Sequence, residues 1–229
     1  DIVNSAKRWK KFPLFSTWQG LLNTASTQLP PLLLTIFFSP SITGIFMLAN
    51  RVLNLPMNMI GSAISNVFFS KSVEACKNEK LASLVVDIHK KLANLAMPPM
   101  ILLLISAPKL FSLVFGKNWI QSGVIAQLMV PWLYFQFIVS PITTLFAVLE
   151  KQKVEMNIHL LLLVFRIISL FIGFSFKNYI LSIALFSLTS TIGYIVLLVC
   201  AFIYTKNRAN ELIIINLKIF VRSFIICLP

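Results

Sequence analysis

Charged residues are scarce in this 229-residue chain. They make up 12 % of the composition, and only seven are acidic against 20 Lys and Arg. Soluble domains carry about 25 % charged residues, so a water-soluble domain of this size would cover its surface poorly. Apolar types reach 58 % and the mean hydropathy is +0.86. The composition therefore excludes an ordinary soluble enzyme, a disordered chain and a nucleic-acid-binding module, and indicates an integral membrane protein.

Catalytic and metal-binding patterns are also lacking. The three cysteines, Cys76, Cys200 and Cys227, match no metal-ligand spacing, and the two histidines, His89 and His159, stand far apart. No Gly-rich phosphate loop occurs, and no carboxylate pair is placed for acid–base chemistry. The sequence therefore predicts a protein that is not an enzyme and that uses no metal or cofactor.

Long stretches without charge determine the fold class. Residues 12–50, 52–70, 92–108, 118–149 and 178–205 contain no Asp, Glu, Lys or Arg. A bilayer core of about 30 Å needs about 20 apolar residues in a helix, and continuous apolar runs lack the alternation of barrel strands. We predict an all-α, polytopic membrane protein with a six-helix bundle. The predicted spans are residues 15–39, 42–70, 92–115, 123–149, 156–176 and 179–205.

The basic residues predict the orientation of these spans. Lysines and arginines gather before the first span and in alternate connections, at residues 7–11, 71–91, 151–153 and 206–208, and are rare in the others. By the positive-inside rule both ends of the chain are cytoplasmic. The domains are then a cytoplasmic amphipathic linker (1–13), a transmembrane lobe (14–205) and a tail (206–229). The excess positive charge reflects topology, and no nucleic acid partner is predicted.

Two segments beside the predicted spans are amphipathic. In residues 71–91, leucines, valine and isoleucine fall on one helical face and most charges on the other, which favours a cytoplasmic helix in the membrane interface over a plain solvated connector. The tail contains an apolar stretch at 212–228 with Lys218 and Arg222 four residues apart. It lies in the interface, or it is the start of a further span.

The second predicted span has a polar face. Seven polar positions fall within an arc of about 160° on a helical projection. They are Asn50, Arg51, Asn54, Asn58, Ser62, Ser65 and Asn66. An arginine at this depth costs several kcal/mol on most estimates unless it meets water or a partner, and no span offers an acidic residue. Arg51 therefore borders a water-filled cavity or an anionic ligand, or it is satisfied by carbonyls of a neighbouring helix.

Two other spans contribute candidate binding residues. The cytoplasmic half of the first span is polar and includes Gln28, followed by Pro30 and Pro31, which force a kink. Arg166 lies at the centre of the fifth span and shares a face with His159. Because guanidinium groups hold phosphate oxygens with a fork of donors, the two intramembrane arginines favour an anionic substrate. The predicted binding residues are Arg51, Asn50, Asn54, Asn58, Gln28 and Arg166.

Several short motifs, in this order and spacing, resemble a known family. They include residues 10–16 (KKFPLFS), 28–30 (QLP), 38–40 (FSP), 48–57 (LANRVLNLPM), 115–116 (FG), 131–132 (PW), 140–141 (SP) and 151–152 (KQ). Together they resemble the second half of O-antigen and polysaccharide flippases (Wzx-type) of the multidrug/oligosaccharidyl-lipid/polysaccharide exporter superfamily. The resemblance covers nearly the whole chain and is most specific over residues 10–152.

The resemblance implies a fold and a function. The chain would be one six-helix lobe of a MATE-like transporter in the bacterial inner membrane, paired with an N-terminal six-helix lobe. The implied substrate is an isoprenoid-pyrophosphate-linked oligosaccharide, moved by alternating access, with membrane lipids as the surrounding partners. Another exporter of the superfamily, such as a drug/cation antiporter, remains an alternative. That class should carry intramembrane carboxylates, which these spans lack. A membrane enzyme of polysaccharide assembly is the third reading.

Overall fold

The computed structural model describes residues 11–227, apart from the side chains of residues 11–19, 23, 27, 209, 226 and 227. Most of the predicted linker and the last two residues of the tail lie outside the described residues. Within them every regular element is a helix, which confirms the all-α class. The elements are α2 (Lys11–Phe37), α3 (Pro40–Lys77), α4 (Leu81–Phe115), the 3₁₀ turn η1 (Lys117–Trp119), α5 (Ile120–Ile142), α6 (Thr144–Val148), α7 (Gln152–Ser175), α8 (Tyr179–Tyr204) and α9 (Ala209–Cys227).

Five helical segments among the described residues are long and apolar enough to cross a membrane. They are α3, α4, the stretch Lys117–Val148 that contains α5 and α6, α7 and α8. The first predicted span forms α2, but amides, hydroxyls and two prolines dilute its apolar content, and it is not among the five. The helical, multi-pass character is therefore confirmed, whereas the count of six spans is not.

The separate interfacial helix predicted at 71–91 does not form. Instead α3 runs on to Lys77 and α4 begins at Leu81, so a short turn divides the segment. Glu79 in this turn has a φ of 56°, a left-handed conformation that stops a helix. The apolar stripe that the sequence showed is real, but it continues directly into the span of α4, where Val85 and Leu92 are buried.

The predicted span 123–149 is likewise divided. Helix α5 ends at Ile142, and the short helix α6 starts at Thr144. Pro141 has no N–H to donate to the preceding turn, which weakens the helix at this point. The hydroxyl of Thr143 donates to the carbonyl of Ser140 at 2.8 Å, a local bond that competes with the backbone ladder.

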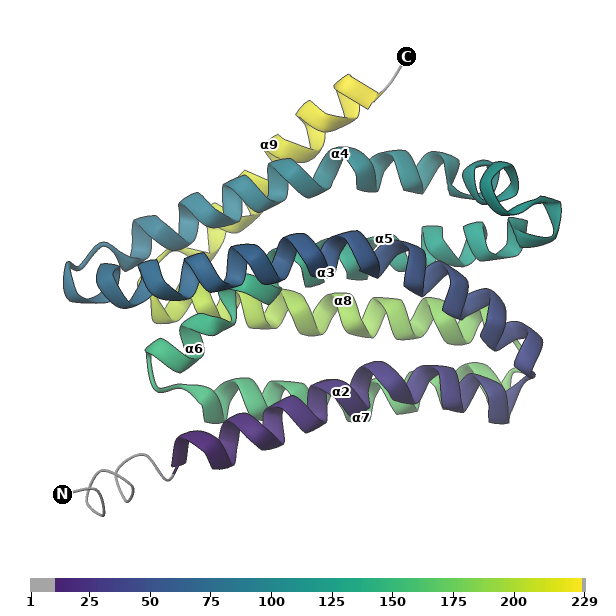
Figure 1. Ribbon diagram of the computed structural model, residues 1–229, viewed down its shortest axis with the longest axis horizontal. Coiled ribbons are helices and arrows are strands. Elements are labelled where there is room, and N and C mark those ends of the chain that lie inside the picture. The colour runs from purple at the N-terminus through teal and green to yellow at the C-terminus, as the bar shows by residue number, and fades with distance from the viewer. Residues whose placement is uncertain (1–10, 228–229) are drawn as a thin grey trace.

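The helices run alternately along the long axis of the molecule (Figure 1). α2 and α7 lie along one side, α3, α5 and α8 in the middle, and α4 with α9 on the other side. The turns at 78–80, 149–151 and 205–208 lie at one end, which we call the basic end, and Asn207 Nδ2 donates to the carbonyl of Ala82 across it at 3.0 Å. The structure thus brings the lysine-rich connections to one end of the bundle.

Helix α5 is the centre of the core, since it packs on α3, α4 and α8. Its close approach to α4 depends on Gly123, where an added Cβ would lie 2.4 Å from Cα of Pro108. At the far end α7 approaches α8 through Gly173, where a Cβ would lie 2.4 Å from Cα of Ser182. In the tail, α9 packs on α4 and buries Leu212 and Ile219.

Candidate functional site

The polar face of α3 lines a pocket against α5. The pocket has a volume of about 340 Å³. Its lining residues are Asn54, Met57, Asn58, Gly61, Ser62 and Ser65 from α3, with Gln136, Phe137 and Ser140 from α5. Helix α3 turns its apolar side inward, so that Phe46, Leu53 and Phe68 are buried. The amphipathic pattern seen in the sequence therefore places the amides and hydroxyls around one hollow.

Amides and hydroxyls dominate the polar lining, and none of the described residues that line the pocket is charged. Asn54 Nδ2 donates to the backbone carbonyl of Asn50 at 2.9 Å and to its side-chain oxygen at 2.6 Å. This pair leaves the carbonyl oxygen of the Asn54 side chain as an acceptor. Asn58 is exposed and Ser65 is half-buried. A lining that both donates and accepts without net charge suits a ligand rich in hydroxyl groups.

Gln136 was not among the predicted site residues. Its side-chain oxygen Oε1 is buried and has no hydrogen-bond partner among the described residues. A buried acceptor without a partner costs about 1–3 kcal/mol, so water or a ligand in the pocket would stabilise it. The signal was present in the sequence, because Gln136 and Ser140 are four residues apart in a mostly apolar span.

Gly61 forms part of the pocket wall. It is buried, yet a Cβ added there would have no heavy atom within 4 Å. The missing side chain therefore contributes open volume to the hollow. A larger residue at this position would project into free space without displacing the backbone of a neighbouring helix.

Arg51 lies one helical turn from the pocket. It precedes Asn54 by three residues, so both occupy the same face of α3. Its side chain is exposed, and no carboxylate among the described residues lies within 4.0 Å of it. The structure thus places a guanidinium group beside the neutral pocket without including it in the lining.

Arg166 occupies a different place from the pocket. Its side chain is 2 % exposed and lies among α2, α5, α7 and α8. Nε donates to Ser190 Oγ at 2.8 Å, and Nη1 donates to Ser26 Oγ. The guanidinium carbon lies 5.1 Å, 5.5 Å and 5.8 Å from the ring centroids of Phe186, Trp132 and Tyr194. Aromatic faces and serine hydroxyls therefore enclose this cation.

The predicted site residues thus fall into three groups. Asn54 and Asn58 line the pocket, while Asn50 and Arg51 adjoin it on α3. Gln28 is exposed on α2 and does not line this pocket. Arg166 is enclosed in the bundle.

A carboxylate is buried where the sequence analysis expected none. Glu155 is 4 % exposed in α7, a helix counted among the membrane-crossing segments, and His159 follows it by four residues with 6 % exposure. Glu155 lies one residue before the predicted span 156–176, so the sequence placed it in a connection. Among residues 11–227 no three His, Cys, Asp or Glu side chains gather as metal ligands.

A comparison with protein families identifies the family of the chain. A family model described as "Polysaccharide biosynthesis protein" matches residues 3–124, which is more than half of the chain. No curated protein and no solved structure matches it. The matched region includes α2, α3 and α4, and therefore the α3 wall of the pocket. Together with the apolar helices, this match shows that the chain belongs to the polysaccharide biosynthesis protein family, as a membrane protein of polysaccharide transport or biosynthesis.

Proposed function

We propose that the chain is one lobe of a flippase that moves isoprenoid-pyrophosphate-linked oligosaccharide, such as an O-antigen unit, across the bacterial inner membrane by alternating access. The family match supports a role in polysaccharide transport or biosynthesis. The motif resemblance over residues 10–152 supports pairing with an N-terminal six-helix lobe. The gathering of lysine-rich turns at one end supports an orientation with that end, and both chain ends, in the cytoplasm.

The pocket between α3 and α5 is the observation that carries this proposal. A sugar head group loses its hydration on entering a membrane protein, and this is costly unless polar groups replace the water. Asn54, Asn58 and Gln136 offer amide donors and acceptors, and Ser62 and Ser65 offer hydroxyls. The outer faces of the helices are apolar, so the isoprenoid chain can remain in the bilayer while the sugars occupy the pocket.

Arg51 is the proposed contact for the pyrophosphate. It stands on the pocket face of α3, is exposed and has no carboxylate partner among the described residues. A guanidinium group can bind two phosphate oxygens at once. We propose that Asn50 holds Asn54 in place through its hydrogen bonds. We also propose that Gln28, which is exposed on α2, contacts the substrate. Arg166 acts by joining helices, because its Nε and Nη1 bind Ser190 and Ser26, while its buried Nη2 has no hydrogen-bond partner among the described residues.

Filling the pocket tests the proposal. In bacteria whose only copy of the protein is the variant, Gly61→Leu should lower surface polysaccharide at least tenfold and cause lipid-linked oligosaccharide to accumulate. The matched control is Gly44→Leu on the same helix, where a Cβ also meets open space but which does not line this pocket. Equal export by both variants, at equal protein level, would contradict the proposed role of the pocket.

A charge test separates the phosphate contact from the sugar pocket. Arg51→Ala should reduce export strongly, and Arg51→Lys should restore part of it, because a lysine keeps the charge but loses the fork of donors. Wild-type export by both variants would contradict the assignment of Arg51.

A cation-coupled exporter is the second candidate, and the buried Glu155 favours it. A carboxylate inside a membrane-crossing helix is the group such transporters use to bind a cation. Glu155→Gln would abolish transport driven by a sodium or proton gradient if this reading holds. In a flippase without such coupling, the same variant would retain export in proportion to its folded amount.

A further inference from the structure

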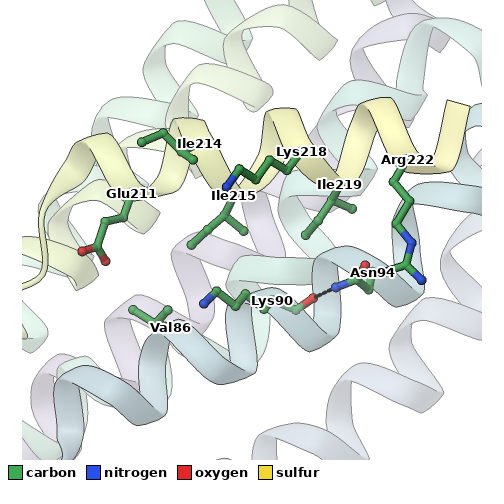
Figure 2. A pocket seen from close by; sticks show the side chains of 9 residues that line it. All are labelled: Val86, Lys90, Asn94, Glu211, Ile214, Ile215, Lys218, Ile219 and Arg222. Carbon is green, nitrogen blue, oxygen red and sulfur yellow. Dashed lines mark hydrogen bonds between the residues drawn. The ribbon is translucent and has the colours of Figure 1, made fainter.

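An open groove lies between α4 and α9, apart from the pocket between α3 and α5. It has a volume of about 490 Å³, and the two hollows share no lining residue. Figure 2 shows its nine lining side chains, with Ile215 and Ile219 projecting from α9 toward α4. They are Val86, Lys90 and Asn94 from α4, and Glu211, Ile214, Ile215, Lys218, Ile219 and Arg222 from α9.

Positive charge predominates in this groove. Lys218 and Arg222 are four residues apart on one face of α9, and Lys90 lines the groove from α4. In Figure 2 the amino ends of the two lysines point toward the Glu211 end of the groove, and Arg222 lies beside Asn94. Glu211 is the single acidic residue among the described ones that line the groove, and it lies at one end of the groove in Figure 2. None of the three cations has a carboxylate within 4.0 Å among the described residues. The groove therefore has three basic lining residues against one carboxylate, and an excess of positive charge remains.

Apolar walls flank these cations on both sides. Inside the groove lie Val86 and three isoleucines of α9. Lys218 and Arg222 also line another open hollow along α9, which is otherwise formed by Leu217, Val221 and Ile225. A ligand that satisfies both features has a negative head group and hydrocarbon chains. Free phosphate would use the cations but leave the apolar walls in contact with water.

The position of the groove along the membrane normal suits a lipid head group. Helix α4 has 35 residues, so it spans about 52 Å, roughly 20 Å more than a bilayer core. Lys90 lies nine residues after Leu81, about 14 Å from the start of the helix at the basic end. This is near the boundary between hydrocarbon and head groups, where lysine and arginine bind anionic lipids.

We propose that the groove between α4 and α9 binds an anionic glycerophospholipid, with its head group placed among Lys90, Lys218 and Arg222. The isoleucines contact its acyl chains. Asn94 adds a hydrogen-bonding group at the same level, since its Nδ2 already donates to the carbonyl of Lys90 at 2.8 Å and its oxygen remains as an acceptor for a head-group hydroxyl. The bound lipid would fasten α9 to α4. The site is independent of the proposed transport function.

Native mass spectrometry of the purified chain tests this site directly. The protein is equilibrated with phosphatidylglycerol and phosphatidylcholine at equal concentration, and the lipids retained after detergent release are counted. The wild type should retain one phosphatidylglycerol in preference to phosphatidylcholine. Each cation near an anionic membrane surface contributes about fivefold to binding. Lys218→Gln with Arg222→Gln should therefore weaken phosphatidylglycerol retention about thirtyfold.

The matched control removes the same amount of positive charge from exposed positions outside the groove. Lys77→Gln with Lys206→Gln changes two exposed lysines that do not line the groove and should leave retention unchanged. Lys218→Arg should also retain the lipid. Equal loss in both double variants, or no preference in the wild type, would overturn the proposal. Preferential retention of an isoprenyl diphosphate, or displacement of phosphatidylglycerol by millimolar inorganic phosphate, would overturn it as well.

Discussion

Replacing Arg166 separates a structural role from a substrate-binding role. Arg166→Ala removes a side chain that is 2 % exposed and leaves a cavity among Trp132, Phe186 and Tyr194. Large-to-small changes at buried sites cost about 2–5 kcal/mol. The hydroxyl of Ser26 also loses the donor that Arg166 provides. We expect a loss of about 3–5 kcal/mol in the free energy of unfolding.

The assay is equilibrium unfolding of the purified chain in micelles, followed by helical circular dichroism. Arg166→Lys should cost about 1–2 kcal/mol, because an ammonium group cannot reproduce the two bonds to Ser26 and Ser190 together. Arg51→Ala, at an exposed position, should change the stability by less than about 0.5 kcal/mol. An Arg166→Ala variant as stable as the wild type would refute the reasoning. So would Arg166→Met with normal stability and protein level but no export, since that result would assign Arg166 to the substrate.

Two further predictions concern helix packing. Gly173→Ala should destabilise the bundle by about 2 kcal/mol or more, because the new Cβ would lie 2.4 Å from Cα of Ser182. In the same unfolding assay Gly44→Ala, which has open space at its Cβ, should stabilise α3 by about 0.5–1 kcal/mol. The Tyr134 hydroxyl donates to Asn216 Oδ1 of α9 at 2.7 Å. Tyr134→Phe should therefore lower the free energy of unfolding by about 1 kcal/mol and speed backbone hydrogen exchange in α9. Unchanged exchange would show that this bond does not hold α9 in place.

Charge spacing and periodicity predicted much of the fold. Gaps between charges located the apolar helices, since hydrocarbon thickness sets their length. The same gaps could not locate helix ends, because α3 continues through charged residues to Lys77 and α4 begins while the chain is still polar. Helices protrude from a bilayer without changing their hydrogen bonding, so composition marks the span and not the helix.

The candidate site, like the fold, could be predicted only in part. The 3.6-residue period placed Asn54 and Asn58 on one face, and the structure brings both into one pocket. Periodicity within α3 could not show which helix faces them, so Gln136 of α5 was missed. Likewise, the sequence showed that Arg166 shares a face with His159, but not that serines and aromatic rings from three other helices enclose its guanidinium group. Contacts between distant segments depend on packing that a one-dimensional pattern does not contain.

Accessibility of the α3 pocket tests the central claim, that a hydrated polar pocket in the membrane binds the sugars of a lipid-linked oligosaccharide. In membranes, and with the three native cysteines replaced, Asn58→Cys should react with a polar maleimide, whereas Leu53→Cys, at a buried position of α3, should not. Added isoprenoid-pyrophosphate-linked oligosaccharide should slow the reaction at position 58 at least fivefold. Equal reactivity at both positions, or a rate at position 58 that saturating substrate leaves unchanged, would contradict the account.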